Sequence, residues 1–548
     1  MDSRRCRERL IAHFGGLAVL SCFSPTRLDL HFSCPHKSLF TVNAPLHPIV
    51  ARLSRRLAVV TLAVSVVAAT CSPRFAAADE STPPNIVLIF ADDLGYADIG
   101  CFGSEINRTP RIDRLASEGS KFTHFYNAQA VCSASRAALM TGCYSNRVGM
   151  EGALNHTSPA GIHPDERLIP EILQDQGYAT AMFGKWHLGL SPYFSPLKNG
   201  FDEYFGIPYS NDNTKYHPTL AEIMPPLPLY DGDEVIEEDP DQSLFTRRCT
   251  QRAVDFINRN HDRPFFLYVP HIMPHVPIFA SEDFRGRSPH GLFSDVIEEI
   301  DWSVGQIVDA VDAAGLGDNT LIIVTSDNGP FLSYGAHAGR ATPLREGKLT
   351  AFEGGVRVPC VIRWPGKVPA GRVCDAPLMT IDLLPTFVRL TGAELPAAII
   401  DGRDATDLLF GELDAAWAER PLLFYTGNEL HAVRQGRWKL HLDHPYLTKV
   451  NDEVRDDGKP AGHGTLAPKS ITQSGVEGIA SRHGYRIAQQ TQALYDLQQD
   501  PGEATDLADR HPDVVARLLE IVEQARNDLG DRLTDRVGSR VRPAGRSD

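Results

Sequence analysis

Short, uninterrupted apolar runs recur along this chain of 548 residues and constrain its fold more than any other feature. They cover residues 86–90, 179–183, 265–269 and 321–325. Strands that are buried on both faces of a largely parallel sheet have this pattern. Amphipathic helices are predicted between the runs, at residues 167–176, 245–258 and 293–314. The alternation predicts an α/β domain with helices on both faces of the sheet.

The pattern changes after residue 421. Short strands without long helices between them are predicted at residues 422–425, 431–434 and 438–442. A polar, glycine-rich stretch at 443–485 is interpreted as a long loop, and 514–529 as a closing helix. We therefore expect a large domain at about 79–418 and a smaller C-terminal part with an antiparallel sheet at 419–548.

The first 78 residues are typical of a leader. A basic segment at 52–56 precedes an uncharged apolar stretch at 57–70 and a small-residue cleavage site at 76–78, so a signal peptide is predicted at about 50–78. The apolar stretch is too short to span a bilayer, and no stable membrane span is expected. Export to the periplasm or secretion is expected. Lipid attachment at Cys71 is the less favoured alternative.

Composition and charge exclude several classes of protein. The chain is 42% hydrophobic and 22% charged, which is ordinary for a globular protein and excludes a disordered one. The net charge is −15, although the first 78 residues hold seven more basic than acidic side chains. An acidic body binds a phosphate backbone poorly, so no nucleic-acid partner is expected.

Six cysteines follow the leader, and none of them forms a C-x-x-C pair. Zinc ribbons and thioredoxin-like redox sites are therefore excluded. Because an exported protein can form disulfides, Cys132–Cys143 and Cys360–Cys374 are candidate pairs, and buried free thiols are the alternative.

Acidic residues directly follow two of the apolar runs. Asp92 and Asp93 come after the first run, and Asp327 and Asn328 after the fourth. Ligand sites of open α/β sheets lie beyond the carboxyl ends of the strands. Three converging carboxylates repel one another unless a cation is present, and with an amide they suit Ca²⁺ or Mg²⁺. Either pair alone could instead be an ordinary cap or turn.

Basic and titratable residues follow the other strand ends. Lys185 and His187 come after the second run and share one side if the strand continues. His271 and His275 follow the third run, and Lys348 lies a little after the fourth. Each has an ordinary structural interpretation, but together they indicate a site for an anionic substrate.

The segment 131–142, VCSASRAALMTG, resembles the sulfatase signature, a cysteine followed by proline or alanine and an arginine at the start of an apolar helix. The resemblance implies that Cys132 is oxidised to formylglycine by a maturation enzyme and that its hydrate attacks the sulfate ester. Ala134 replaces the more common proline, so conversion depends on a maturation enzyme that tolerates alanine.

The resemblance covers about residues 85–507 and is closest to the arylsulfatase A and N-acetylgalactosamine-6-sulfatase group. It implies an alkaline-phosphatase-like fold, a large mixed sheet flanked by helices with a smaller C-terminal antiparallel sheet. The implied cation is Ca²⁺, with Mg²⁺ less favoured, held by Asp92, Asp93, Asp327, Asn328 and residue 132. The implied catalytic and substrate-binding residues are Cys132, Arg136, Lys185, Ser210, His187, His275, Lys348 and His441.

The expected function is hydrolysis of aryl sulfates or sulfated carbohydrates. Lys185, Lys348 and Ser210 would neutralise the sulfuryl group, His275 would protonate the leaving oxygen, and His187 would take the remaining proton from the diol. A phosphodiesterase or phosphonate hydrolase on the same scaffold and a non-catalytic binder of sulfated glycans are the alternatives. The stretch 443–485 has no clear counterpart in the family, which leaves the choice of substrate open.

Overall fold

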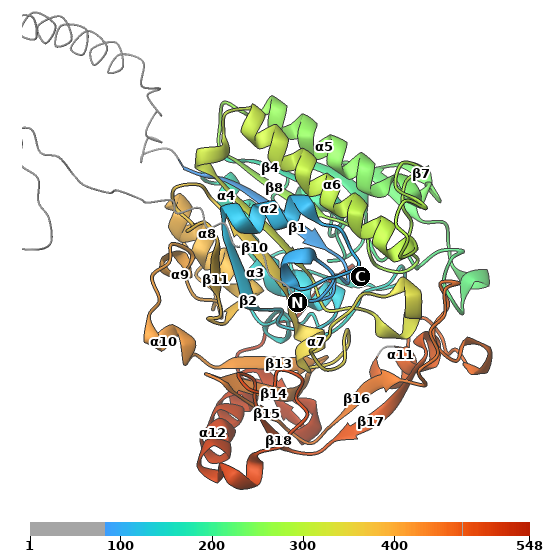
Figure 1. Ribbon diagram of the computed structural model, residues 1–548, viewed down its shortest axis with the longest axis vertical. Helices are drawn as coiled ribbons and strands as arrows, with labels where there is room; N and C mark the ends of the chain where they lie inside the picture. Colours follow the sequence, from blue (N-terminus) through green and yellow to red (C-terminus); the bar gives the residue numbers. More distant parts are fainter. Residues whose placement is uncertain (1–82, 474, 548) are drawn as a thin grey trace, which may run out of the picture. The chain divides into compact units, whose positions relative to one another are not determined.

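A computed structural model describes residues 83–473 and 475–547 (Figure 1). The predicted signal peptide and Cys71 lie outside the described residues. Within them, eleven strands form one mixed sheet: β1 (Asn85–Ala91), β2 (Ser120–Tyr126), β4 (Ala179–Lys185), β5 (Glu203–Ile207), β6 (Pro228–Asp231), β7 (Glu234–Glu238), β8 (Phe265–Pro270), β9 (Thr320–Ser326), β10 (Arg357–Arg363), β11 (Arg372–Cys374) and β12 (Leu378–Met379). Their order is β11-β2-β10-β9-β1-β8-β4-β5-β6-β7, with β12 beside β2.

The four apolar runs of the sequence form the parallel centre of this sheet. β9, β1, β8 and β4 are neighbours in that order, and Val87 of β1 lies opposite Ile322 of β9 and Leu267 of β8. All seven residues of β1 are buried. The prediction of a parallel sheet core is confirmed, and β10, which runs antiparallel to β9, makes the sheet mixed.

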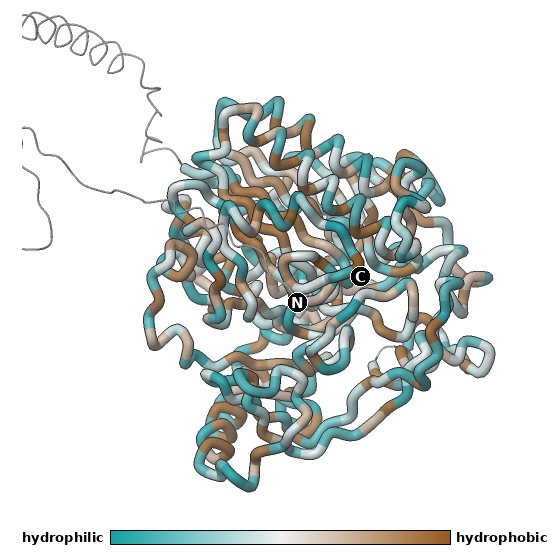
Figure 2. Tube along the Cα trace, in the orientation of Figure 1, coloured by the Kyte–Doolittle hydropathy of each residue, from teal (hydrophilic) through white to brown (hydrophobic). Residues whose placement is uncertain are grey.

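Helices cover both faces of the sheet, as predicted. On one face lie α2 (Pro110–Glu118), α5 (Phe245–Arg259) and α6 (Leu292–Ala313), whose apolar residues share a core with Val87 and Ile89. On the other lie α3 (Cys132–Thr141), α4 (Ile169–Gln174) and α8 (Leu383–Thr391), which pack with Ile86, Leu88 and Phe90. Figure 2 shows hydrophobic segments running through the central strands and mixed colouring along α5 and α6. Alternate side chains of one strand therefore build two cores.

The C-terminal part forms a second, antiparallel sheet in the order β13 (Leu422–Thr426), β14 (Glu429–Gln435), β15 (Trp438–His441) and β18 (Ala493–Asp496). The helix α12 (Pro512–Leu529) packs on it through Leu518 and Val522, which share a core with Phe424 and Leu440. The predicted small antiparallel sheet and closing helix are confirmed. The boundary at 418/419 stays a prediction.

The interpretation of 443–485 as one long loop is wrong at both ends. β16 (His444–Lys449) pairs antiparallel with β17 (Tyr485–Gln490), and α11 (Gly475–His483) directly precedes β17. The two-stranded sheet of β16 and β17 is held by pairing between segments far apart in the sequence, which the local residue pattern does not encode. Short elements complete the described chain: α7 (Glu353–Val356), α9 (Thr406–Leu409), α10 (Ala415–Ala418), and the strand pairs β3 (Ala160–Gly161) with β21 (Gly545–Arg546) and β19 (Gly530–Asp531) with β20 (Arg536–Val537).

Neither candidate disulfide is present, and all six cysteines of the described chain are free thiols. Cys132 begins α3 and Cys143 follows its end, which places them about 16 Å apart at the rise of an α-helix. Cys360 and Cys374 both pair with Phe122 from opposite sides of β2, so two strand spacings, about 10 Å, separate their backbones. Both separations exceed the reach of a disulfide.

Candidate active site

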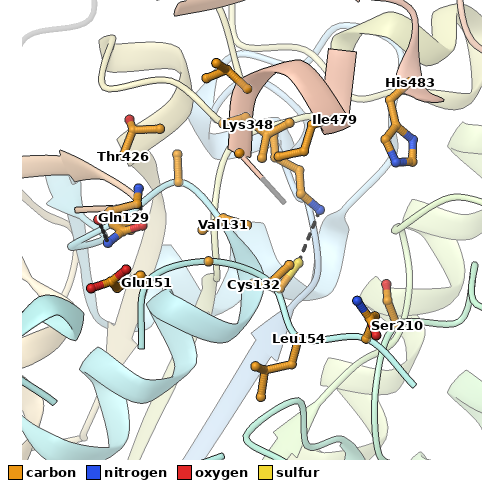
Figure 3. A pocket seen from close by; sticks show the side chains of 18 of the residues that line it. Gln129, Val131, Cys132, Glu151, Leu154, Ser210, Lys348, Thr426, Ile479 and His483 are labelled. Atoms are coloured by element: carbon orange, nitrogen blue, oxygen red, sulfur yellow. Dashed lines mark hydrogen bonds between the residues drawn. The ribbon is translucent and has the colours of Figure 1, made fainter. Parts of the chain in front are cut away.

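A cavity of about 430 Å³ opens beyond the carboxyl ends of the central strands (Figure 3). Five of the residues predicted from sequence line it: Cys132, His187, Ser210, His275 and Lys348. Four more lie beneath them: Asp92 and Asp93 directly after β1, and Asp327 and Asn328 directly after β9. The parallel register of β1 and β9 therefore brings together groups that lie more than 200 residues apart in the chain.

The helix α3 positions Cys132 and Arg136 on one face, one turn apart. All ten of its residues are buried. Arg136 donates hydrogen bonds from Nε (3.1 Å) and Nη2 (2.9 Å) to Asp327 Oδ2 and from Nη1 (2.8 Å) to the carbonyl oxygen of Lys185. Arg136 thus ties the start of α3 to the ends of β9 and β4, which fixes the position of Cys132.

The thiol of Cys132 lies between the carboxylate of Asp92 and the ammonium group of Lys348. It donates to Asp92 Oδ1 at 3.4 Å, and Lys348 Nζ donates to its sulfur at 3.2 Å (Figure 3). Burial and, to a lesser extent, the charge of Asp92 raise the pKa of the thiol well above its ordinary value. The unmodified cysteine is therefore a protonated thiol at neutral pH and a poor nucleophile.

The acidic residues form a buried group of mutually repelling carboxylates. Burial, with the neighbouring Asp92 and Asp327, raises the pKa of Asp93 to about 7 despite its contact with Lys348. Burial also acts on Asp92, but Lys185 and the other nearby cations hold the pKa of Asp92 well below its ordinary value. An additional positive charge would therefore favour the ionised form of Asp93.

The donor set fits a divalent cation. Asp93 Oδ2 and Asn328 Oδ1 are buried oxygen atoms without a hydrogen-bond partner, although the rest of each side chain is engaged. Ligand atoms of Asp92, Asp93, Cys132 and His275 all lie within 4.8 Å of one another. Asp327 is not in this set, and its oxygens accept from Asp93 N (3.0 Å) and from Arg136. The oxygen donors among these residues, those of Asp92, Asp93 and Asn328, suit Ca²⁺ or Mg²⁺.

Two lysines contact the acidic residues, one from the end of a strand and one from a loop. Lys185, the last residue of β4, donates to Asp92 Oδ2 at 2.5 Å and to Ser210 Oγ at 3.2 Å. Lys348 donates to Asp93 Oδ1 at 2.6 Å. Because both ammonium groups are buried beside the cavity, they provide positive charge for an anion that enters it.

The two cavity histidines predicted from sequence, His187 and His275, each have one ring nitrogen held by a backbone carbonyl. His275 Nδ1 lies 2.6 Å from the carbonyl oxygen of Val276, so Nε2 faces Ser210 Oγ (3.2 Å). His187 Nε2 lies 2.7 Å from the carbonyl oxygen of Leu154, which leaves Nδ1 buried without a partner. Burial and Lys348 lower the pKa of His275 to about 3, and burial and Lys185 lower that of His187, so both rings are neutral. β4 ends at Lys185 and His187 has a φ of 62°, so the two do not share a strand face.

Two predicted histidines do not reach the cavity. His441 is stacked on Phe352 and contacts Glu503 (2.9 Å) and His444 (3.1 Å) in a separate buried cluster. His271 is buried beside Ser303, whose Oγ lies 3.0 Å from its Nε2. Neither residue is among those that line the cavity.

Sequence reasoning missed much of the cavity wall. Asp212, Arg482 and His483 line it on one side, and Gln129 and the β13–β14 turn at Gly427 line it on the other. Gln129 holds this turn by accepting from Gly427 N (3.1 Å) and donating to its carbonyl oxygen (2.8 Å). No local motif marks these residues, but Asp212 lies two positions after the predicted Ser210 and could have been included on that ground.

Comparisons with known proteins agree with this geometry. The family model described as "Sulfatase" matches residues 84–393, and "C-terminal region of aryl-sulfatase" matches 418–545. N-acetylgalactosamine-6-sulfatase of Mus musculus is 36% identical over 477 residues, covering 83% of this chain and 88% of that protein. Arylsulfatase A of Homo sapiens is 36% identical over 464 residues, covering 81% and 87%. The crystal structure of Ps i-CgsB in complex with k-i-k-neocarrahexaose has a TM-score of 0.65 at 29% identity and covers 81% of this chain and 92% of its own.

The fold and the site define an alkaline-phosphatase-like hydrolase with a buried cluster suited to a metal ion. The chain belongs to the sulfatase family, and it is an enzyme that hydrolyses sulfate esters. Membership of this family implies a metal ion and a formylglycine residue. No helix in the part of the chain that the structure describes is long and apolar enough for a bilayer crossing.

Proposed function

We propose that a formylglycine-generating enzyme converts Cys132 to formylglycine and that the converted residue is the nucleophile for sulfate-ester hydrolysis. The observation that carries this proposal is the placement of Cys132 at the start of α3, inside the cavity and hydrogen-bonded to Lys348. The buried thiol itself is protonated and poorly reactive. The hydrated aldehyde supplies two oxygens, one to attack sulfur and one whose deprotonation releases the bound sulfate.

We propose that the cation is Ca²⁺ rather than Mg²⁺. Asp92, Asp93, Asn328 and residue 132 would hold it, with Asp327 completing the set. The two unpartnered oxygens and the several carboxylates support this choice, because Ca²⁺ takes six to eight oxygen ligands. When bound, the cation would polarise a sulfate oxygen and stabilise the deprotonated nucleophile.

The polar residues around Cys132 have separate roles. Arg136 holds the diol from the same face of α3, while Lys185, Lys348 and Ser210 bind the sulfate oxygens and offset the charge that develops during transfer. His187 takes the proton of the remaining diol hydroxyl on its free Nδ1.

His275 protonates the leaving oxygen from Nε2, since Nδ1 donates to Val276. In the ligand-free site, burial and Lys348 keep this ring neutral. Sulfate binding opposes the effect of Lys348 and raises the pKa of His275, so the acid becomes protonated when substrate is present.

The substrate class is an aryl sulfate or a sulfated carbohydrate, and the protein acts outside the cytoplasm after removal of the leader. The printed names of an N-acetylgalactosamine-6-sulfatase and of a complex with neocarrahexaose favour the carbohydrate. Export is supported by the leader at 50–78. N-terminal sequencing of the exported protein should give a start near Asp79, and a cytoplasmic chain that retains the leader would contradict export.

The function is tested by comparing kcat/KM for 4-nitrophenyl sulfate, 4-nitrophenyl phosphate and bis(4-nitrophenyl) phosphate with purified, mature enzyme, followed by a panel of sulfated sugars. We expect a clear preference for the sulfate ester. Higher kcat/KM for either phosphate ester would favour a phosphoesterase. Absence of any turnover by fully converted protein would favour a glycan-binding role.

A further inference from the structure

The segment around α11, which the sequence pattern does not mark, forms part of the cavity wall. Ile479, Arg482 and His483 of this helix line the cavity, and Figure 3 shows Ile479 and His483 reaching it beside Lys348. His483 Nδ1 lies 2.8 Å from the hydroxyl of Tyr334, which anchors the end of the helix to the large domain. The helix α11 therefore contributes residues to the wall of the cavity.

Arg482 is a buried cation without a counter-ion. Its side chain is 5% exposed, and Nη1 donates at 2.9 Å to the carbonyl oxygens of Ser470 and Gln473. Its Nε is buried and has no hydrogen-bond partner. No carboxylate in the described residues forms an ion pair with it, and burial lowers the pKa of this guanidinium.

Burying an unpaired guanidinium costs free energy unless an anion binds to it. Buried arginines are almost always paired, because loss of hydration is not otherwise offset. The guanidinium presents a planar fork of N–H donors that matches the paired oxygens of a carboxylate or a sulfate. Because Arg482 lines the cavity that receives substrate, the missing partner is an anionic group of the substrate.

The neighbouring group of Asp212, His217 and His483 does not change this conclusion. Their ligand atoms lie within 4.8 Å of one another, which resembles a metal site. However, His217 Nδ1 accepts from Thr219 N (3.2 Å) and Leu220 N (3.0 Å), so the ring hydrogen is on Nε2. That nitrogen is a donor and not a ligand. Asp212 lies beside His217 and His483, and it forms no ion pair with Arg482.

We propose that Arg482 binds a second anionic group of the substrate, a carboxylate or a further sulfate, on the leaving-group side of the scissile ester. The ring of Phe331 lies 6.2 Å from the ring of His275 and 5.2 Å from that of His483, the residue next to Arg482, which places Arg482 on the side of the residue assigned to the leaving oxygen. The inference rests on the proposed sulfatase function. It narrows the substrate to molecules with at least two anionic groups.

The test uses three chromogenic sulfate esters: 4-nitrophenyl sulfate, the sulfate ester of 4-hydroxy-3-nitrobenzoic acid, and 4-nitrocatechol disulfate. The last two add a carboxylate and a second sulfate. Wild type should prefer at least one of them to 4-nitrophenyl sulfate. In Arg482→Met, the ratio of kcat/KM for that ester to kcat/KM for 4-nitrophenyl sulfate should fall about 10- to 100-fold, the effect of losing one charge-assisted hydrogen bond. Arg482→Lys should lose less, because it keeps the charge without the fork.

Arg486→Met is the matched control, since Arg486 is an exposed arginine on β17 that does not line the cavity. It should leave the ratio unchanged. An equal loss for all three esters in both Arg482 variants would show that Arg482 only supports the fold, and would overturn the proposal. The proposal is also overturned if the wild-type enzyme prefers neither dianionic ester to 4-nitrophenyl sulfate. A wild type with converted residue 132 that hydrolyses none of the three would contradict the proposed function itself.

Discussion

The ammonium group of Lys348 lies 3.2 Å from the sulfur of Cys132, although 216 residues separate the two in the chain. Leu349 N donates to the carbonyl oxygen of Ala130 at 2.8 Å, so the two loops are joined beside this contact. The same ammonium lies 2.6 Å from Asp93 Oδ1. Lys348 therefore links the acidic cluster to Cys132, and its positive charge lies beside both.

Replacing this lysine by a neutral side chain of similar length tests that link. Lys348→Met should lower kcat/KM for 4-nitrophenyl sulfate about 10²- to 10³-fold, the usual cost of removing one preorganised electrostatic contact from a transition state. Lys367→Met, at an exposed position, is the control and should leave kcat/KM unchanged. A loss of less than threefold in folded Lys348→Met protein would show that this charge does not act on the reaction.

Removal of the cation should affect both activity and stability. Chelation should abolish turnover and lower the melting temperature, because a ligand at 100 times its Kd stabilises the folded state by about 2.7 kcal/mol. Ca²⁺ should restore both better than Mg²⁺, and Asp93→Asn should weaken the response. Full activity in protein shown by elemental analysis to be metal-free would contradict a metal site. Better rescue by Mg²⁺ would correct only the identity of the ion.

His271 should make stability depend on pH without taking part in the reaction. Burial lowers the pKa of His271 to about 4, against 6.5 for the ordinary side chain, so the unfolded chain binds this proton first as the pH falls. Its contribution to stability is complete above pH 6.5 and is lost as the pH falls towards 4. In His271→Gln, the loss of unfolding free energy between pH 7 and pH 5 should be about 2 kcal/mol smaller. Chemical denaturation at both pH values measures this, and an unchanged pH dependence would contradict it.

Much of the catalytic centre could be predicted because its residues lie in short segments after recognisable strands. Asp92 and Asp327 directly follow continuous apolar runs, and the register of β1 and β9 places them together. Cys132 and Arg136 lie on one helix, so their shared face follows from helical spacing. These relationships depend on local pattern and on general rules for parallel sheets.

The remaining features depend on contacts between distant segments, which local pattern does not encode. His441 lies in a strand as expected, but its side chain enters a separate cluster with Glu503, 62 residues later in the chain. The polar stretch that contains Arg482 looks like a loop because α11 is short and β16 is held by a remote partner. The residues of the cavity wall are therefore harder to predict than those at the strand ends.

The central claim is that residue 132 is formylglycine in the active enzyme. Conversion of the thiol to the aldehyde changes the mass of the peptide that contains residue 132, so peptide mass spectrometry gives the converted fraction. Activity on 4-nitrophenyl sulfate should be proportional to that fraction, absent in Cys132→Ala, and absent in Cys132→Ser, which offers one oxygen and cannot release the bound sulfate by elimination. Fully active protein whose residue 132 is entirely unmodified cysteine would contradict the account.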